Sequence, residues 1–215
     1  MKQHAYQSTG LSLIIGAILV IVTMVMHPSG GSMERILSIS KTITVTHALA
    51  IFCLPIILFG FYGLTHKLMD TRKIAILAFL ILAFGLIAAM FAALINGLTV
   101  PYFLGKYADR LEENREVLEP ILTYSFAINT PLDYIFIVAC CLAILLYSIS
   151  ILMTRAFPVW LGYFGVLFGL FVIVGASTGF VFTNLTGFRI VTFSIAAWIL
   201  CAGFFVMRFK VYTDE

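Results

Sequence analysis

The sequence predicts an all-α membrane protein, a bundle of six transmembrane helices with a short amphipathic helix on the extracytoplasmic side. Of its 215 residues, 62% are hydrophobic and 11% are charged, against about 45–50% and about 25% in soluble domains. Six apolar runs fill the chain, and each is long enough to cross the hydrocarbon layer, which takes about 20 helical residues. No soluble domain fits between them, so we interpret residues 1–215 as a single transmembrane domain.

The six spans are expected at about 10–27, 44–64, 74–98, 131–153, 158–180 and 188–208. Their continuous apolarity differs from the alternating pattern of a membrane β-barrel. The first run follows Lys2 and His4, as a secretory signal would. It is longer than the usual run of about 7–15 residues and no small-residue cleavage pattern follows it. We therefore expect it to be retained as a helix.

The segment 99–130 is predicted to hold the amphipathic helix. Its acidic residues fall on the face opposite to a series at helical spacing, which is Leu104, Ala108, Leu111, Arg115, Leu118 and Leu122. A single rod from 120 to 153 would be about 51 Å long, against about 30 Å for the bilayer core. We therefore expect a kink or break near Pro131, of the kind that lines cavities at membrane depth.

Basic residues favour cytoplasmic termini. With six spans, the termini and the turns 65–73 and 154–157 share one side, which carries seven basic residues: Lys2, Lys67, Arg72, Lys73, Arg155, Arg208 and Lys210. The other side has six, and the seven lie in shorter segments close to helix ends, where positive charge acts most strongly on orientation. No basic stripe interleaved with aromatic residues is present, so nucleic acid is excluded as a partner.

Polar side chains gather at the other, extracytoplasmic end of the spans, where they predict an outward-facing pocket that binds a ligand. Ionisable and amide side chains are costly in hydrocarbon and often mark functional sites. The predicted ligand-binding residues are His27, His47, Asn96, Asn129, Asp133, Tyr134, Asn184 and Arg189. Asp133 is expected to pair with Arg189.

Structural explanations compete with this interpretation, because helix ends are polar in any case. His27 precedes Pro28 and could simply end a helix, and Asp133 suits a helix N-terminus. His47 follows Thr46, which is a plausible N-cap.

A divalent metal is a further alternative, with His27, His47 and either Glu34 or Asp133 as ligands. The separation of the histidines matches no local metal motif, and a bis-histidine haem is not favoured. The four cysteines form no CxxC pair and are interpreted as packing residues.

The fifth span is rich in glycine, with small residues four apart at Gly165 and Gly169 and at Gly175 and Gly179. Such pairs allow close helix packing. They predict a contact surface for a second copy of the chain or for another membrane protein, in addition to membrane lipids.

The stretch from Thr154 to Gly165 reads Thr-Arg-Ala-Phe-Pro-Val-Trp-Leu-Gly-Tyr-Phe-Gly, and Trp198 follows in the last span. Over roughly residues 145–206 the chain resembles uncharacterised bacterial membrane proteins of six to seven helices, whose late turn reads basic-x-x-Pro-x-Trp-Leu-Gly. This resemblance implies a multi-pass topology in the bacterial inner membrane. It implies no activity and no catalytic residues.

Three functions remain open from the sequence. The first is a binding or transport module that holds a small amphipathic or lipid-like ligand between aromatic walls. The second is a membrane enzyme using His27, His47 and Asp133 as metal ligands or acid–base groups. The third is an accessory subunit of a membrane complex. The sequence leaves open whether the protein is an enzyme.

Overall fold

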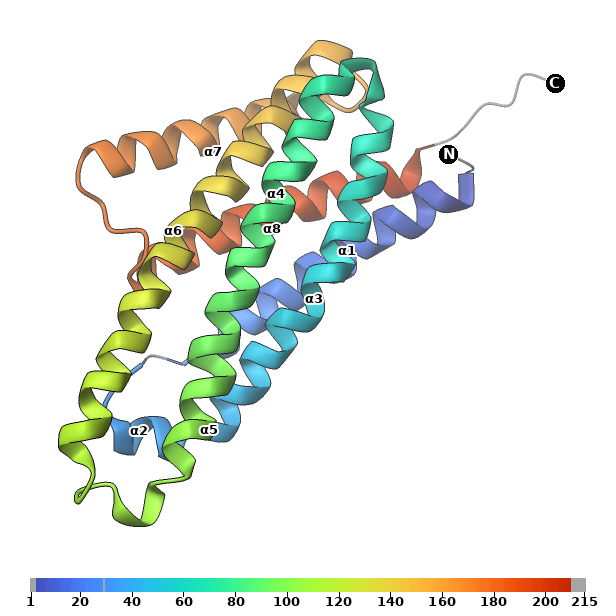
Figure 1. The fold of residues 1–215 in the computed structure, drawn as a ribbon. Coiled ribbons are helices and arrows are strands. Elements are labelled where there is room, and N and C mark those ends of the chain that lie inside the picture. Colours follow the sequence, from blue (N-terminus) through green and yellow to red (C-terminus); the bar gives the residue numbers. More distant parts are fainter. Residues whose placement is uncertain (1–2, 29, 210–215) are drawn as a thin grey trace.

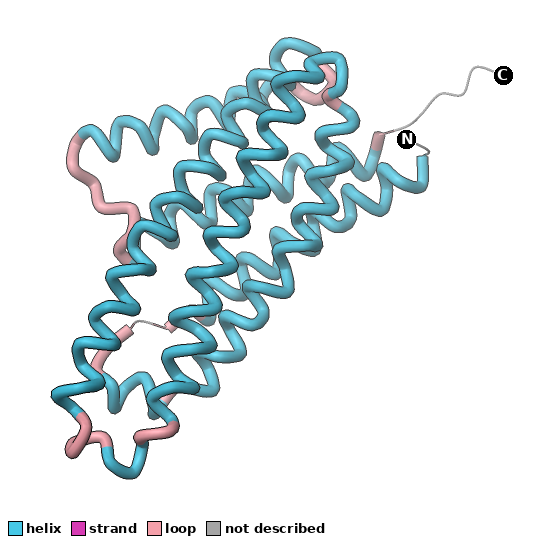
Figure 2. Tube along the Cα trace, in the orientation of Figure 1, coloured by secondary structure: helices cyan, strands magenta, loops and turns pink. Residues whose placement is uncertain are grey.

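The computed structural model describes residues 3–28 and 30–209, and within these ranges the regular structure is entirely helical (Figures 1 and 2). Six helical segments are long and apolar enough to cross a membrane, which confirms the predicted fold class. They are built from α1 (Gln3–Met26), α3 (Ser40–Lys67), α4 (Arg72–Ala92) with its continuation to Gly105, α6 (Arg115–Thr154), α7 (Val159–Ser177) and α8 (Leu185–Arg208).

The helices form two layers. In one, α1 lies between α3 and α8, and in the other, α6 lies between α4 and α7. The beginning of α1 and the end of α8 lie at one end of the bundle, and the short helices α2 (Met33–Ser38) and α5 (Val100–Gly105) lie at the opposite end (Figure 1). We call these the terminal end and the cap end. Lys2 and Lys210, which entered the orientation argument, lie outside the described residues.

Contacts at the terminal end place the first, second and sixth spans together. The amide nitrogen Nε2 of Gln3 donates to the carbonyl oxygen of Phe209 at 2.6 Å. The hydroxyl of Tyr6 lies 3.4 Å from Nδ1 of His66, at the end of α3. The start of α1 and the end of α8 therefore share one side with the turn between α3 and α4, as an even number of spans requires.

Glycines hold α1 close to both of its neighbours. A methyl group at Gly10 would overlap the backbone of Met207 on α8, and one at Gly203 would lie 2.8 Å from Cβ of Leu13. On α3, a methyl group at Gly60 would lie 2.5 Å from Cγ of the same Leu13. Close backbone approach maximises packing between membrane helices. Close packing through glycine therefore also occurs in the first, second and sixth spans and is not confined to the glycine-rich fifth span.

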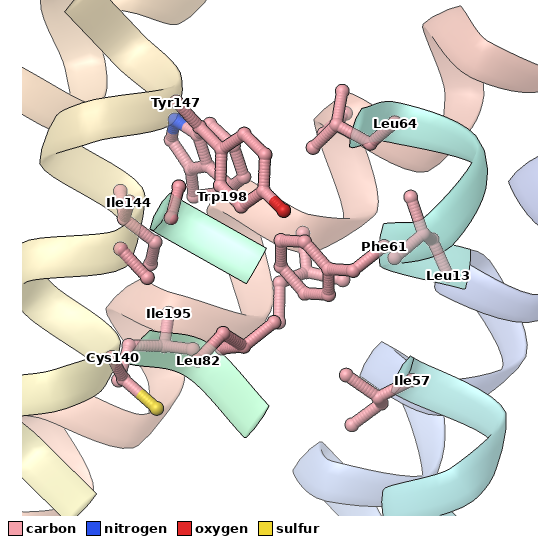
Figure 3. Close-up of a cluster of buried hydrophobic side chains, with 14 of the residues drawn as sticks. Leu13, Ile57, Phe61, Leu64, Leu82, Cys140, Ile144, Tyr147, Ile195 and Trp198 are labelled. Carbon is pink, nitrogen blue, oxygen red and sulfur yellow. The ribbon is translucent and has the colours of Figure 1, made fainter. Parts of the chain in front are cut away.

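Aromatic side chains close the centre of the bundle. Phe61, Tyr147 and Trp198 are fully buried, and the rings of Phe61 and Trp198 are stacked with centroids 6.4 Å apart (Figure 3). Each polar atom of this aromatic plug is paired. The hydroxyl of Tyr147 lies 2.6 Å from Oγ1 of Thr65, and Nε1 of Trp198 donates to the carbonyl oxygen of Leu161 at 3.1 Å.

A second apolar cluster, which we call the cap, closes the opposite end. It consists of Met33, Ile36, Ile43, Val100, Leu104, Leu118 and Leu122. Ion pairs at its surface join α2 to the start of α6, because Arg115 contacts Glu34 at 2.5 Å and Glu112 at 2.6 Å. Hydrogen bonds from Ser32, from its own backbone amide and from Arg115 lower the pKa of Glu34 to about 2.

The cap region differs from the prediction in three ways. The single amphipathic helix expected within 99–130 is wrong, because α5 ends at Gly105, a 3₁₀ turn spans Ala108–Arg110, and α6 begins at Arg115. The helix α2 was not predicted, since its six residues are too short to show periodicity.

The break expected near Pro131 is also absent, because α6 runs without interruption over 40 residues. Leu118 and Leu122 in its first turns pack into the cap cluster, which holds the N-terminal part of the helix in place. The part of α6 before the predicted span, residues 115–130, therefore extends beyond the apolar run and remains helical.

Replacing Gly10 with alanine is expected to destabilise the bundle. The added methyl group meets backbone atoms of Met207, which a side-chain rotation cannot relieve. Overpacking costs about 1–3 kcal/mol, which exceeds the gain of up to about 1 kcal/mol from replacing a helical glycine. Thermal unfolding in detergent should show a lower midpoint for Gly10→Ala. Gly105→Ala is the control, because nothing lies within 4 Å of its added methyl group; equal midpoints for the two variants would contradict the close contact.

Candidate functional site

A cavity of about 390 Å³ lies between the two layers, towards the cap end. Its walls come from α1, α3, α4, α6, α8 and the segment that follows α4. The volume falls within the range of about 300–1,000 Å³ that is typical of small-molecule sites. The residues of the aromatic plug do not line the cavity, so they separate it from the terminal end.

From a level of polar side chains, the wall of the cavity becomes apolar towards the middle of the bundle. On α3 the lining runs from His47 through Ala50 and Cys53 to Ile57. His47 and Ile57 are ten residues apart, or about 15 Å at 1.5 Å per residue. On the cap side of His47 the lining is also apolar, with Ile43 one turn away.

The other helices repeat this change in the same direction. Asn96 is followed inward by Leu86 and Leu82, and Thr192 on α8 is followed inward by Ile195 and Ile199. Figure 3 shows Leu82, Cys140 and Ile195 brought close together from three helices, with Ile57 on a fourth. We call the polar level the polar belt; it consists of Thr23, His27, His47, Asn96, Asn129, Asp133 and Thr192.

The two histidines meet in this belt. The ring centroids of His27 and His47 are 4.9 Å apart, with an angle of 56° between the ring planes. Nδ1 of His47 lies 2.8 Å from the carbonyl oxygen of Ile43. Because a carbonyl oxygen can only accept, this nitrogen carries the proton and donates. Nδ1 of His27 is buried and has no hydrogen-bond partner among residues 3–28 and 30–209.

A π-helix shapes the wall opposite His47. Residues Ala93–Thr99, which continue α4, wind with this wider turn and include Asn96 and Gly97. Such segments are frequent at functional sites. A side chain at Gly97 would overlap the ring of His47, so glycine is required for the ring to lie where it does.

Asp133 and Arg189 have different partners from those expected. Nδ2 of Asn129 donates to Oδ2 of Asp133 at 2.6 Å, and the guanidinium of Arg189 donates to the carbonyl oxygen of His27 at 3.2 Å. An ion pair between Asp133 and Arg189 is not found among the described residues. One turn of α6 separates Asn129 from Asp133, so the nearest donor for this carboxylate lies on its own helix.

Three predicted site residues lie outside the lining. The side chain of Asn184 accepts from the amide of Gly187 and caps α8, and Tyr134 is 45% exposed on the outer face of α6. Arg189 supports the wall through the backbone of His27. Thr46 is also not an N-cap, because α3 begins at Ser40, more than a turn earlier.

The predicted metal ligands are not gathered into one site. Among the described residues, no group of three or more His, Cys, Asp and Glu side chains could hold a metal ion. Glu34 instead forms the ion pair with Arg115 at the surface of the cap. The two histidines therefore have no third ligand of this kind beside them.

Several polar atoms of the belt have no hydrogen-bond partner in the part of the chain that the structure describes. In the lining these are Oγ1 of Thr23, Nδ1 of His27, Oδ1 of Asn96 and Oγ1 of Thr192. A buried polar group without a hydrogen bond costs about 1–3 kcal/mol. Sequence analysis missed Thr23 and Thr192, because a single threonine inside an apolar run resembles a packing residue. The signal for Thr23 was its position one turn before His27.

The glycine-rich face of the fifth span packs within the chain. Methyl groups at Gly162 and Gly165 would meet Leu152, Ser148 and Trp198, on α6 and α8. This part of the face is therefore not free for a partner. Gly179 adopts a positive φ of 81° in the turn after α7.

The turn that carries the resemblance has a structural role. Arg155 adopts a left-handed conformation at the end of α6, with a φ of 51°, and Pro158 immediately precedes α7. The carbonyl oxygen of Leu161 receives the hydrogen bond of Trp198.

Comparisons with protein-family models, curated proteins and solved structures found no match for this chain.

Replacing Thr23 with valine is expected to stabilise the ligand-free protein. Valine has the same shape and removes a buried hydroxyl that has no partner among the described residues. A gain of about 1 kcal/mol would raise the midpoint of thermal unfolding by about 2–4 °C in a chain of this size.

Thr65→Val is the control for this experiment. Its hydroxyl bonds to Tyr147 and to the carbonyl oxygen of Phe61, so this variant should lower the midpoint. A similar loss in both variants would show that the hydroxyl of Thr23 is already satisfied inside the protein.

Proposed function

We propose that this multi-pass membrane protein binds a small amphipathic or lipid-like ligand in the cavity between its two helix layers. The observation that carries the proposal is the single level of polar side chains in the lining, from which the wall becomes apolar towards the middle of the bundle on α1, α3, α6, α8 and the helical segment that contains Asn96. A cavity with this gradient complements a molecule with one polar end and one apolar end. The unpartnered atoms of the polar belt offer hydrogen bonds to the polar end.

The closed centre of the bundle favours binding over an open path through the membrane. Phe61, Tyr147 and Trp198 are fully buried between the cavity and the terminal end. The membrane itself is the natural source of such a ligand, because large apolar side chains such as Phe52, Phe84 and Leu167 are more than half exposed towards it.

Purification in mild detergent followed by native mass spectrometry tests the proposal. The protein should retain a small molecule that is released by organic solvent. Ala89→Phe places a ring into the cavity from α4 and should lose the retained molecule. Leu80→Phe is the control, because Leu80 is 59% exposed on the same helix and lies outside the lining.

Ala50→Phe fills the cavity from the facing helix α3, which keeps the test decisive if Ala89→Phe fails to fold. If the molecule is retained equally by the cavity-filling variants and by the control, it is bound elsewhere and the proposal fails.

We further propose that the cap faces the extracytoplasmic side of a bacterial inner membrane and that both termini are cytoplasmic. This orientation is supported by the basic residues at the terminal end, which are Lys67, Arg72, Lys73, Arg155 and Arg208.

A fluorescent protein fused after Glu215 should fold and fluoresce, since it folds in the cytoplasm. Alkaline phosphatase inserted at Glu112, in the cap, should be active, since it requires the periplasm. The reverse pair of results would invert the orientation.

A further inference from the structure

We infer that the ligand is an uncharged amphiphile whose head group carries a hydroxyl, bound with this hydroxyl in the polar belt and its apolar part against the inner wall. The inference rests on the proposed function and deepens it by naming the ligand class. It follows from the charges of the lining, from the hydrogen-bonding capacity of the unpartnered atoms, and from the direction of the cavity.

The lining disfavours an anionic head group. It contains neither lysine nor arginine among the described residues, and its single acidic side chain is Asp133. A carboxylate or phosphate in the belt would approach that carboxyl group, whereas the guanidinium of Arg189 lies outside the lining and is bound to the carbonyl oxygen of His27. In a low-dielectric site, burying an unpaired charge costs far more than burying a neutral polar group.

A cationic head group is disfavoured by the partners that the belt already contains. The carboxyl group of Asp133 accepts a hydrogen bond from the amide of Asn129 at 2.6 Å. The guanidinium of Arg189 is bound to the backbone of His27, directly behind the belt. This positive charge opposes the entry of a second one.

The unpartnered atoms fit a group that both donates and accepts. Oδ1 of Asn96 can only accept, so its partner must donate. The hydroxyls of Thr23 and Thr192 can take either role, and Nδ1 of His27 donates or accepts according to its tautomer. A hydroxyl group carries one donor and two acceptor positions, so it can satisfy Asn96 and a second group at once. A head group with acceptors alone would leave Asn96 without a partner.

The direction of the cavity places the apolar part of the ligand. The cap closes the space above the belt with Ile36, Ile43 and Val100. From His47 the wall runs inward to Ile57 over about 15 Å. The apolar part therefore points away from the cap, towards Leu82 and Ile195 (Figure 3).

Photolabelling with matched probes tests the head group. Three probes share a twelve-carbon chain with a diazirine at its far end and differ only in the head group, which is an alcohol, a carboxylate or an amine. Each is incubated with the purified full-length protein in mild detergent and irradiated, and the labelled peptides are mapped by mass spectrometry. The alcohol should label the inner wall around Ile57, Leu82 and Ile195 at least tenfold more than the carboxylate or the amine. An excess of unlabelled dodecanol should compete.

Variants separate the polar belt from general partitioning into the protein. Asn96→Leu removes the acceptor at nearly constant size and should reduce labelling by the alcohol about tenfold. Asn114→Leu is the matched control, because its amide bonds to the carbonyl oxygen of Arg110 in the turn before α6 and lies outside the cavity lining. If Asn96→Leu fails to fold, Thr23→Val provides the same test with a hydroxyl of the belt.

The outcomes distinguish the two proposals. Absence of labelling at the inner wall by all three probes contradicts the proposed function. Labelling by the carboxylate or the amine as strong as by the alcohol leaves the binding function standing and overturns the assignment of an uncharged head group. Labelling by the alcohol that is unchanged in both Asn96→Leu and Thr23→Val overturns the role of the polar belt.

Discussion

A polar side chain within a lipid bilayer has no water to bond with, and this constraint determines where every polar group of the protein is placed. In the aromatic plug, the hydroxyl of Tyr147 and the indole nitrogen of Trp198 both have partners. In the polar belt, buried atoms of Thr23, His27, Asn96 and Thr192 have no partner among the described residues. Unpaired groups of this kind lower stability. Buried hydroxyls without a partner also occur outside the belt, at Thr46, Ser148 and Ser150, but the four atoms of the belt line a cavity, where the proposed ligand would bond to them.

The cavity follows from unequal packing of the two layers. Gly10, Gly60 and Gly203 allow α1 to approach α3 and α8 closely, so that this layer is compact. The two layers meet at the cap, at the turn between α3 and α4, and around the plug, where Tyr147 of α6 contacts Phe61 and Trp198. Between these contacts the space is lined by small residues such as Ala50 and Ala89, which do not fill it. Space of this kind persists only because both of its ends are firmly packed.

The sequence alone was sufficient to predict the properties that depend on composition and on the spacing of apolar residues. Runs of about 20 apolar residues can satisfy their backbone only as membrane helices, so the six spans were predictable. Five of the eight predicted site residues line the cavity, including His27, His47 and Asp133, because polar residues within apolar runs are visible in the sequence. Asn184 and Tyr134 were grouped with them only because they share the same end of the bundle.

The remaining features depend on contacts between distant segments. The packing of Leu118 and Leu122 into the cap keeps α6 helical beyond Pro131, and no local pattern reveals this packing. The glycines of the fifth span predicted close helix packing without naming the neighbour, and in the fold Gly162 and Gly165 lie against α6. A small residue shows that a helix comes close, but only the fold shows which one.

The aromatic plug also bears on the choice between binding and transport. A ligand that moved from the cavity to the terminal end would have to separate Phe61 from Tyr147 and Trp198, whose rings are in contact. Rotating Tyr147 would break its bond to Thr65, and moving Trp198 would leave the carbonyl oxygen of Leu161 without its donor. Each buried group left unpaired costs about 1–3 kcal/mol. The belt, by contrast, would gain hydrogen bonds from the proposed ligand. For that ligand, the free-energy difference between these two steps favours retention in the cavity over passage through the bundle.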